Sequence, residues 1–582
     1  MGAFWCLQVL PLSVTALMPV IVVPLFGIQS AKDVIHNYMR DVIMVFACSL
    51  MIAVAIEKSG IHRRLAIYIL MQVGGQPKWI TLGFMLPTWF LSMWITNTAT
   101  TAMVMPIAEA VLRELEAPVE KVTEPEPVVE AETVMMYTWS EHNGGVIMDP
   151  LSTDQLTRIQ RKKPTSPVAR TTREMPRQSG EADDITLNTE GTEGGSWYEV
   201  NLSTASINGK EGFRSREGDI AKSVILSVAY AANIGGIATL IGTPANLILK
   251  ENADAMWKSA HLPSPVEFLP WMAFSLPISA IMLFLMWVWS SPPPSSSGSP
   301  APDHRREEMM VKFLKEERDR IGAITFAEVM TVVLFVIMIL LLFTRHPMFM
   351  PGWAEYFKPG YVDDDCAMML IVFAMFLIPA NTPHTDILTA RQSTPDTLLD
   401  WETMRTRFPW GFIFVLGGAY ALADACAVSG LSLWIGKRLV ISSLPDIAMV
   451  MVLSLLTAAF TELASNTAVT TILMPIVGCM AIDLGKNPLY LMLPVAVTTS
   501  FSFMFPVSSP PNAIAFATGR LRVVDMVKAG CVPPLLCVVT VALATQTWGM
   551  ALFGLSSVPW KNATVLSDSG ACWEFFKVHG GE

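Results

Sequence analysis

Long apolar segments without charged side chains recur along most of this chain, separated by shorter polar connections. Charge-free stretches cover residues 10–28, 42–56, 271–289, 329–343, 367–378, 447–460 and 532–547. Several of them approach the roughly 20 apolar residues that a helix needs to cross the ~30 Å hydrocarbon core of a bilayer. One such segment could be a buried core helix, but so many of them predict an all-α, polytopic membrane protein.

The N-terminal apolar segment is predicted to be a true membrane span. Residues 4–28 are apolar, and no Lys or Arg precedes them. A secretory signal peptide would have a basic region ahead of its apolar core and a small-residue cleavage site after it. Neither feature is clear here, so we expect a span rather than a removable signal.

Two polar segments interrupt the apolar pattern. Residues 112–222 are rich in Glu, Thr, Pro and Ser and contain no plausible core, which predicts a largely disordered insert. Residues 290–321 open with a Pro/Ser run and continue, over 304–320, with charges at helical spacing, which predicts a solvated helix. By the positive-inside rule, the basic residues at 62–64, 210–222 and 304–320 indicate the cytoplasmic side.

Composition argues against several other classes of protein. The 582 residues are 52% hydrophobic and 15% charged, whereas soluble domains carry about a quarter charged residues. The net charge of −10 comes without a basic stripe, which argues against a nucleic-acid partner. The eight cysteines are scattered singly without metal-ligand spacing. The motifs described below contain no His and no nucleophile–base set, so an enzyme is not expected.

An internal repeat is the most informative property of the sequence. WITNTATTAMVMPI at 94–107 aligns without a gap with LASNTAVTTILMPI at 463–476. The alignment pairs Asn97 with Asn466 and Thr98 with Thr467. Repeats of this kind indicate two copies of one structural unit.

Two further matches support the division into halves. Ser59-Gly60 and Ser429-Gly430 each close an apolar run, and they lie almost as far apart in the chain as the two Asn-Thr segments. GTPANLIL at 242–249 resembles SSPPNAIA at 508–515, but these two segments are closer together. The difference is about the length of the polar insert, so the insert interrupts the first of two homologous halves.

Each half also contains an apolar segment broken by Pro and Gly, at 235–244 and at 506–511. Such a break frees backbone groups, which are costly in hydrocarbon unless they line a polar cavity or bind a ligand. Freed carbonyls can coordinate Na⁺ and exposed N–H groups attract anions, which is typical of secondary transporters. An ion channel would need a continuous pore with rings of charge or a filter motif, and none is visible.

The paired Asn-Thr segments offer uncharged ligands for both kinds of ion. An Asn carboxamide has an oxygen for a hard cation and an NH₂ group for a carboxylate, and the following Thr adds a hydroxyl. Asn and Thr can instead serve as hydrogen-bonding glue between membrane helices, but two aligned copies, each followed by a break, favour binding. Glu462 is a functional candidate as an intramembrane acid; a structural pairing or a place in a water-filled vestibule is equally open.

These motifs resemble those of solute carrier family 13, the sodium-coupled di- and tricarboxylate and sulfate carriers of the divalent-anion/sodium symporter family. The resemblance rests on LSMWITNTATTAMVMPI, IGGIATLIGTPANLIL, FVLGGAYALADACAVSGLSLWIG, TELASNTAVTTILMPI and FPVSSPPNAIAFATGRLRVVDMVKAG. It extends over essentially the whole chain except the polar insert.

The resemblance implies a homodimer in the plasma membrane, in which each protomer has a scaffold domain and a transport domain that moves like an elevator. The two repeats would have inverted topology, with each Asn-Thr segment at the tip of a re-entrant hairpin. The expected organisation is a first repeat at 1–111 and 223–290, a cytoplasmic insert at 112–222, a cytoplasmic linker with an amphipathic helix at 291–324, a second repeat at 325–555 and an extracellular tail at 556–582.

The resemblance also implies a set of site residues. A small dianionic substrate would bind Asn97, Thr98, Thr243, Pro244, Asn466, Thr467, Ser509 and Pro510. A first sodium ion would bind Ser92, Thr96, Asn97 and Gly242, and a second would bind Thr461, Ala464, Asn466 and Ser508. Asn562, in the sequon Asn562-Ala563-Thr564, matches the glycosylated extracellular tail of the family.

Three features depart from the family pattern. Thr96 stands where Ser is usual, and Ile241 stands where vertebrate carboxylate carriers tend to have Thr. The chain begins at what resembles the second span of the family, so we expect about ten spans rather than eleven and an N-terminus on the opposite side. A truncated gene model or a splice form would explain this beginning.

Two segments of the sequence point to different substrate classes. IATLIGTPANLIL resembles the carboxylate carriers more closely, whereas AMVMPIAEAV resembles the sulfate carriers. We expect sodium-coupled symport of succinate, citrate and similar anions. Sulfate symport and sodium-independent anion exchange are the alternatives, and an anion channel is the least favoured.

Overall fold

The computed structural model describes residue 4 and residues 10–558, apart from 74–76, 117–134, 143–144, 151–187, 193–194, 201–210, 292–303, 347–349, 359–360, 382–395, 432–433 and 435–443. By its contacts the chain separates into two units. The larger unit contains Ser13–Ala117 and Gly218–Glu582 and is helical where it is described; the smaller contains Pro118–Glu217 and also takes in Gln8–Leu12. The predicted glycosylation site at Asn562 lies outside the described residues.

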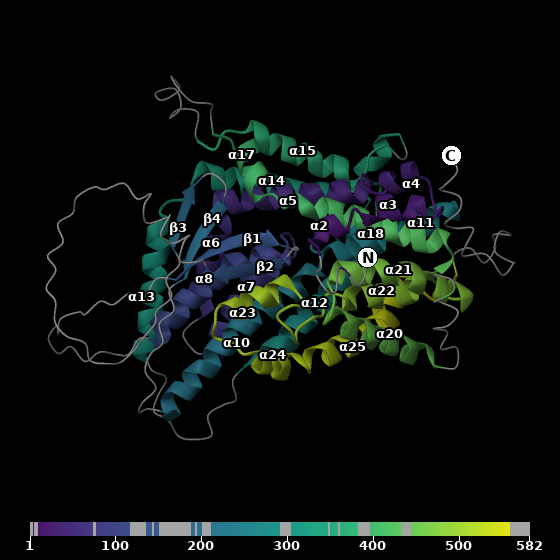
Figure 1. The fold of residues 1–582 in the computed structure, drawn as a ribbon. Helices are drawn as coiled ribbons and strands as arrows, with labels where there is room; N and C mark the ends of the chain where they lie inside the picture. The colour runs from purple at the N-terminus through teal and green to yellow at the C-terminus, as the bar shows by residue number, and fades with distance from the viewer. Residues whose placement is uncertain are drawn as a thin grey trace, which may run out of the picture. The chain divides into compact units, whose positions relative to one another are not determined.

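Helices make up both homologous halves (Figure 1). The first half contains α2 (Leu12–Thr15), α3 (Met18–Leu25), α4 (Ala31–His36), α5 (Asp41–Ser59), α6 (Ile61–Val73), α7 (Pro77–Ser92), α8 (Asn97–Glu116), α10 (Glu211–Gly236), α11 (Pro244–Ser259) and α12 (Phe268–Ser290). The charged stretch between the halves forms the predicted helix, α13 (His304–Ile321). The second half contains α14 (Phe326–Arg345), η1 (Trp353–Tyr356), α15 (Asp364–Leu377), α17 (Trp401–Arg407), α18 (Gly411–Val428), α20 (Asp446–Thr461), α21 (Asn466–Asp483), α22 (Leu489–Thr498), α23 (Pro510–Ala517), α24 (Val523–Gly530), α25 (Pro533–Ala544), η2 (Thr545–Gly549) and α26 (Met550–Phe553).

Fewer unbroken helices than the ten expected spans are long and apolar enough to cross a membrane. Among the described residues there are five, at Ala31–Ser59, Phe268–Ser290, Phe326–Arg345, Asn466–Asp483 and Val523–Phe553. A sixth candidate is a pair of helices, Trp401–Arg407 and Gly411–Cys426, which are bent by 60°. Much of the remaining apolar sequence lies in shorter helices such as α20, which ends at the turn before Asn466, and α22, which ends at the second broken segment.

The positions that align in the sequence also have matching backbone roles. Gly60 ends α5 with φ 77°, and Gly430, shortly after α18, has φ 75°. Both are in the left-handed region that glycine adopts without steric cost, which is why Gly closes each apolar run. Each half also has a helix–turn–helix, α7–α8 and α20–α21, in which the second helix begins at the Asn-Thr segment.

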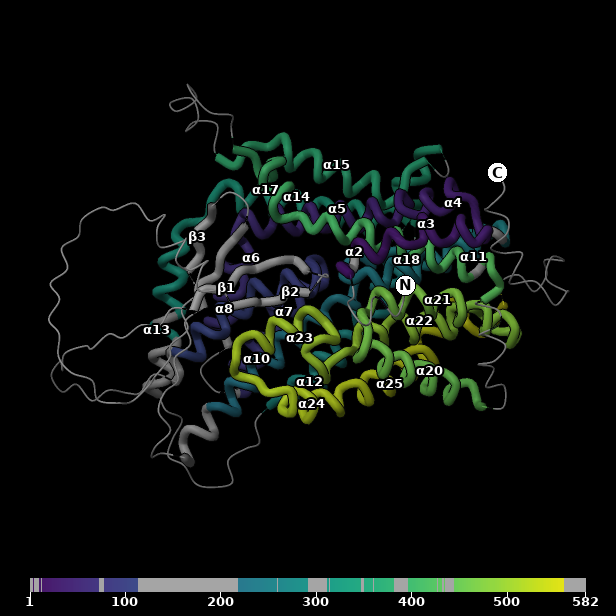
Figure 2. The backbone as a smooth tube through the Cα atoms, viewed as in Figure 1, coloured from purple at the N-terminus to yellow at the C-terminus, as the bar shows by residue number. Residues whose placement is uncertain are grey.

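The two halves pack across one another at their broken segments. Helix α11 of the first half contacts α21 and α22 of the second, and α23 of the second half contacts α8 of the first (Figures 1 and 2). Every residue of α22 is buried, as expected for a helix that is apolar all round. The first break is buried at residues 237–243, whereas the second is buried at 501–503 and 508–509 but has Val507 75% exposed. The freed backbone groups of the buried parts must find partners in the protein.

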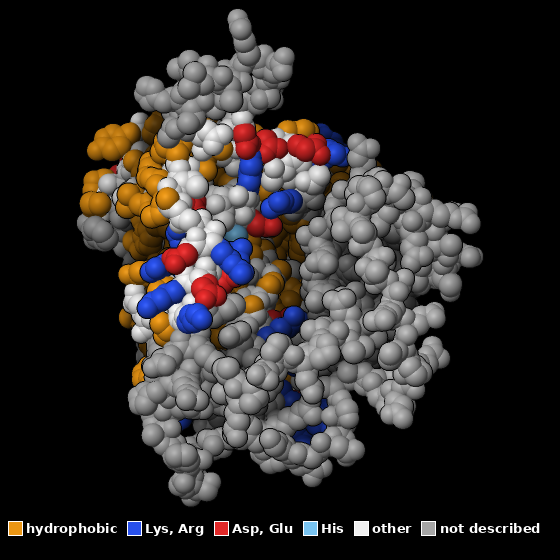
Figure 3. Space-filling view, turned by 90° about the vertical axis from the view of Figure 1, so that its left-hand side faces the viewer, with side chains coloured by type: hydrophobic (Ala, Val, Ile, Leu, Met, Phe, Trp, Pro, Cys, Tyr) orange, Lys and Arg blue, Asp and Glu red, His pale blue; other side chains and the backbone are white. Residues whose placement is uncertain are grey.

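The outer helices present apolar side chains to the surroundings. Leu340 of α14, Phe284 of α12 and Leu377 of α15 are 56%, 58% and 72% exposed, as expected for side chains that face lipid. Charged side chains gather on the face drawn in Figure 3. Ion pairs of the helical unit include Arg63 of α6 with Glu317 of α13, at 2.6 Å.

A buried arginine joins three helices of the unit. Arg345, at the end of α14, has a side chain only 5% exposed. It forms ion pairs with Glu267 ahead of α12 and with Asp363 and Asp364 at the start of α15, the last at 2.9 Å. Because a buried charge is stable only when paired, these carboxylates fix how α12, α14 and α15 meet.

The smaller unit contains a β-sheet that the sequence did not predict. Strands β1 (Met135–His142), β2 (Gly145–Pro150), β3 (Asn188–Thr192) and β4 (Gly195–Val200) pair antiparallel in the order β2-β1-β4-β3. Only Asn143-Gly144 separates β1 from β2 in the sequence, and this pair is favoured in two-residue hairpin connections. The fold is thus mostly helical rather than all-α, and the polar insert contains strands where disorder was expected.

Candidate functional site

The two Asn-Thr segments begin helices directly after tight turns. Asn97 is the first residue of α8, and Asn466 is the first residue of α21, where the Ser465 side chain caps the helix by accepting from the Ala468 N–H. In both helices a threonine one turn later donates to the carbonyl of that asparagine, at 2.8 Å and 2.7 Å. Asn97, Thr98, Asn466 and Thr467 are all half-buried, so their side chains are partly accessible at the helix starts.

Two further helices start at the two broken segments. The chain is unwound between α10 and α11 and again between α22 and α23. Thr243 and Ser509 are the N-cap residues of α11 and α23, both with extended backbone and neither with a side-chain capping bond. Pro244 and Pro510 follow at the first helical position, where a missing N–H costs nothing. The second break is longer than the predicted 506–511, because α22 already ends at Thr498.

Asparagines at repeat-equivalent positions hold both breaks. Asn246 donates from Nδ2 to the carbonyls of Gly236 and Thr239, at 3.0 and 2.7 Å. Asn512 donates to the carbonyls of Ser502 and Phe505, at 3.1 and 3.2 Å. The alignment that pairs the two asparagines also pairs these carbonyl partners, Gly236 with Ser502 and Thr239 with Phe505. Asn246 and Asn512 were aligned from the sequence, but they were not among the predicted site residues.

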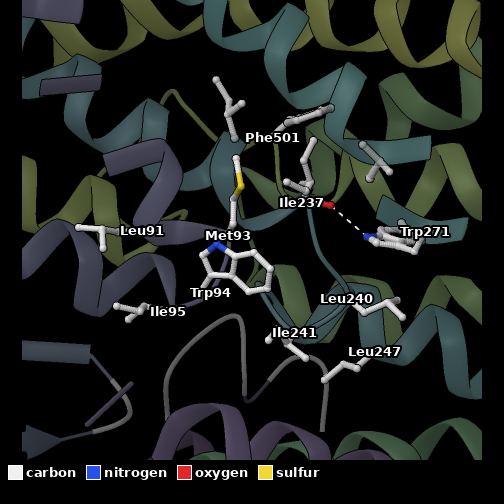
Figure 4. Close-up of a cluster of buried hydrophobic side chains, with 14 of the residues drawn as sticks. Leu91, Met93, Trp94, Ile95, Ile237, Leu240, Ile241, Leu247, Trp271 and Phe501 are labelled. Atoms are coloured by element: carbon white, nitrogen blue, oxygen red, sulfur yellow. Dashed lines mark hydrogen bonds between the residues drawn. The ribbon is translucent and has the colours of Figure 1, made fainter. Parts of the chain in front are cut away.

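Side chains of α12 pair two further carbonyls of the first break. Trp271 donates from Nε1 to the Ile237 carbonyl at 3.1 Å (Figure 4). Ser275 donates to the Ala238 carbonyl at 2.9 Å. Ile241, the apolar departure from the family pattern, is 3% exposed and lies beside Leu240 and Leu247 in the same hydrophobic cluster (Figure 4). The break is therefore supported by packing around it, and Ile241 contributes to that packing.

Three oxygens meet at the first asparagine. Ser92 Oγ lies 2.7 Å from both Asn97 Oδ1 and the Ala232 carbonyl oxygen. A hydroxyl has a single proton, so it can donate to only one of these acceptors at a time. Neutral oxygens gathered in this way are the kind of ligand that a hard cation such as Na⁺ takes. Ser92 and Asn97 belong to the predicted first sodium site, whereas the Ala232 carbonyl was not predicted.

The other two residues of the predicted first sodium site have different surroundings. The Thr96 hydroxyl accepts from the Ala99 N–H at 3.4 Å, so it faces the first turn of its own helix. Gly242 packs so closely that a Cβ there would lie 2.3 Å from the Gly236 carbonyl oxygen. Gly236 itself has room for no side chain, because a Cβ would lie 2.3 Å from Asn97 Oδ1 and 2.6 Å from Thr243 Cγ2. Asn97, Gly236 and Thr243 are thus in contact.

The predicted second sodium site is less closely assembled. Asn466 Oδ1 accepts from Ser502 Oγ at 3.5 Å, and Ser508 Oγ donates to the Phe505 carbonyl at 2.7 Å. Thr461 is buried and donates to the Ala458 carbonyl of its own helix at 2.9 Å, while Ala464 is half-buried in the turn. The Thr461 hydroxyl thus bonds within α20, and the Ser508 hydroxyl bonds within the broken segment. The Asn466 side chain, at the start of α21, contacts the broken segment through Ser502.

The Glu462 side chain binds the backbone of the second broken segment. Of the alternatives left open for this acid, the structure therefore shows a structural pairing. Its carboxylate belongs to a residue that is 3% exposed, and it accepts from three consecutive backbone N–H groups. The donors are Phe503 at 2.7 Å, Met504 at 3.0 and 3.1 Å, and Phe505 at 3.3 Å. These three N–H groups lie in the unwound segment that follows the end of α22 at Thr498. The repeat-equivalent residue is Met93, whose carbonyl accepts from the Thr239 hydroxyl.

Some buried polar atoms at the breaks form no hydrogen bond with the described residues. Thr243 Oγ1, Asn246 Oδ1 and Asn512 Oδ1 have no hydrogen-bond partner among the described residues. Buried polar atoms without a partner are rare and call for an explanation such as a ligand or water. Thr243 is also the predicted substrate ligand at the start of α11, where the helix N-terminus favours negative charge.

The comparisons with known proteins agree with the motifs. The family model for the sodium:sulfate symporter transmembrane region matches residues 1–555. The chain is 35% identical to human solute carrier family 13 member 1 over 574 residues, which cover 96% of this chain and 91% of that protein. It is 36% identical to human Na(+)/dicarboxylate cotransporter 3 over 575 residues, covering 96% and 88% of the two chains.

The chain also matches a third relative and one solved structure. The rat Na(+)/citrate cotransporter is 33% identical over 587 residues, covering 97% of this chain and 92% of that protein. The crystal structure of the Alcanivorax borkumensis YdaH transporter matches with a TM-score of 0.41 and 13% identity, over 88% of this chain and 86% of that chain. The family match shows that the chain belongs to solute carrier family 13, a family of sodium symporters, and the resemblance seen in the motifs is confirmed.

Proposed function

We propose that this chain carries di- and tricarboxylates such as succinate and citrate across the plasma membrane together with sodium ions. One observation supports this most strongly: the helices α8, α11, α21 and α23 begin at the paired Asn-Thr segments and the paired breaks. Hydrogen bonds through Asn233 and Ser502 join the starts of α8, α21 and α23, and Thr243 at the start of α11 packs against Gly236 beside Asn97. Each N-terminus carries roughly half a positive elementary charge. Four such N-termini at the paired segments would favour an anion.

The two-fold repetition favours a substrate with two carboxylates. Each half contributes one Asn-Thr pair and one N-cap hydroxyl, Thr243 in the first and Ser509 in the second. A dicarboxylate can present one carboxylate to each half. Sulfate is a compact anion with one centre of charge and would not use both halves in this way.

Sodium ions would balance the charge of the substrate. None of the predicted site residues is charged, so a bound dianion alone would carry two uncompensated charges into a low-dielectric protein interior. Two sodium ions on neutral oxygens, with Ser92 and Asn97 in one site and Asn466 in the other, would make the loaded site neutral. The same neutrality leaves no unpaired side-chain charge at these ligands when the cargo departs.

The names of the relatives support the same assignment. Two of them are described as cotransporters of Na⁺ with dicarboxylate and with citrate, whereas the family model is described by sodium and sulfate. As part of the proposal, the protein is a homodimer whose transport domains move by an elevator mechanism, with the α7–α8 and α20–α21 pairs as re-entrant hairpins.

Uptake measurements test this function. Cells that express the chain are expected to take up radiolabelled succinate and citrate saturably, with a Na⁺ gradient and not when choline replaces Na⁺. Excess unlabelled sulfate is expected to compete weakly. Strong sulfate uptake would contradict the carboxylate assignment, uptake without Na⁺ would contradict symport, and an unsaturable conductance would contradict a carrier.

A further inference from the structure

A single buried amide touches both halves of the site. Asn233 lies near the end of α10 and is 0% exposed. Its Oδ1 accepts from Asn97 Nδ2 of the first half at 3.4 Å. Its Nδ2 lies 3.2 Å from the Ser509 hydroxyl and 3.2 Å from the Ser502 carbonyl oxygen, both in the second half. No motif in the sequence marked this residue.

The contacts of Asn233 continue to the second asparagine. The Ser502 hydroxyl donates to Asn466 Oδ1 at 3.5 Å. Asn97, Asn233, Ser502 and Asn466 thus form one path between the two repeat-equivalent asparagines. The longest contacts of the path, at 3.4 and 3.5 Å, are those at the asparagines themselves, where hydrogen bonds have room to shorten.

Asn233 also fixes which atom each ligand presents. Because Asn97 donates its NH₂ group to Asn233, its carboxamide oxygen faces the cluster with Ser92 Oγ at 2.7 Å. On its other side Asn233 contacts Ser509, the N-cap of α23, at the predicted substrate site. Because Oδ1 and Nδ2 of Asn233 contact groups of the two halves, this residue can position ligands on both sides at once.

We infer that Asn233 couples sodium binding in the first half to anion and sodium binding in the second, an inference that rests on the proposed function. A cation on Asn97 Oδ1 polarises the amide and strengthens its NH₂ as a donor to Asn233. The stronger hydrogen bond to Asn97 then fixes the Asn233 amide. Asn233 in turn keeps the Ser509 hydroxyl and the Ser502 carbonyl in position for binding in the second half. Coupling of this kind is reciprocal, so the anion also raises the affinity for sodium.

Substitution of Asn233 tests the inference. In Asn233→Ala the path is cut, and we expect the Hill coefficient of the sodium activation curve to fall close to unity. The sodium concentration for half-maximal uptake is expected to rise about 5- to 10-fold, a typical size for coupling between sites. Asn233→Ser, whose short hydroxyl cannot span both partners, is expected to do the same and serves if the alanine variant fails to reach the membrane.

Thr499→Val is the matched control. Thr499 is the repeat-equivalent residue, is 0% exposed, and its hydroxyl bonds to Thr470 and to the Ala496 carbonyl, both of its own half. This variant is expected to keep the wild-type Hill coefficient, since it cuts no path between the halves.

The outcomes separate the two claims. If the wild-type chain shows no sodium-dependent uptake, the proposed function itself is wrong. If the wild-type chain shows cooperative sodium activation and both Asn233 variants, at equal surface amounts, keep its Hill coefficient, the coupling role is wrong. An equal loss of cooperativity in Thr499→Val would also overturn it, because the effect would then come from any buried polar change.

Discussion

Gly236→Ala is expected to lower sodium-dependent uptake by roughly 100-fold or more, because misplacing a ligand by about 1 Å has effects of that size. The added Cβ would lie 2.3 Å from Asn97 Oδ1 and 2.6 Å from Thr243 Cγ2. Real Cβ atoms do not approach other atoms so closely, so the asparagine or the α11 N-cap must move. Both residues belong to the predicted substrate site, and Asn97 also belongs to the first sodium site.

Gly218→Ala provides the control on the same helix. A Cβ at Gly218 meets nothing within 4 Å, and alanine is the better helix former. This variant is expected to transport like the wild-type chain. Normal uptake by Gly236→Ala, measured with labelled succinate at equal surface amounts, would show that Asn97 and Thr243 need not remain where the structure places them.

Glu462→Gln is expected to raise the sodium concentration for half-maximal uptake by roughly 10- to 100-fold. Each carboxylate oxygen accepts from two of the three N–H groups of residues 503–505, and glutamine replaces one oxygen with a donor. A buried N–H left without an acceptor costs about 1–3 kcal/mol, and each 1.4 kcal/mol is a factor of about ten in affinity. The segment would rearrange, and with it Ser508 and Ser509.

The matched control uses the repeat-equivalent residue. Met93 supports its half through its backbone carbonyl, which accepts from the Thr239 hydroxyl. Met93→Leu keeps that carbonyl and nearly the same volume, so sodium activation is expected to change little. If Glu462→Gln retains wild-type sodium activation at a normal surface amount, the carboxylate does not hold the second break in a way that matters for transport.

The repeat and its Asn-Thr segments could be predicted from the sequence because both depend on local patterns. Helices begin at Asn97 and Asn466, glycines with positive φ close the aligned apolar runs, and the chain unwinds at both predicted breaks. Gly, Pro and capping residues act within a few positions of themselves. The order of residues therefore carries the information that determines these features.

The residues that join the site were not predictable in the same way. Asn233 and the Ala232 carbonyl lie on α10, far along the chain from their partner residues Asn97 and Ser92, at separations of 136 and 140 residues, respectively. A lone Asn ahead of a Gly-Gly pair has no spacing that marks it as a ligand. Its role comes from the packing of two halves against each other, which a linear pattern does not record.

Glu462 and the polar insert illustrate two other limits. The sequence marked Glu462 as an unusual acid, but its three N–H partners become available only when the second break begins at residue 499 rather than 506. Residues 112–222 contain strands although their average composition is polar. Short segments such as MMYTWSEH and GSWYEV are rich in strand-forming aromatic residues, and averaging over the long insert conceals them.

The central claim is that Asn97 and Asn466 are equivalent ligands in one sodium-coupled anion site. It is tested most directly by sodium-dependent uptake of labelled succinate in cells that express Asn97→Ala, Asn466→Ala or the wild-type chain at equal surface amounts. We expect saturable, sodium-dependent uptake by the wild-type chain and its loss in both variants. Normal transport by either variant would contradict the claim.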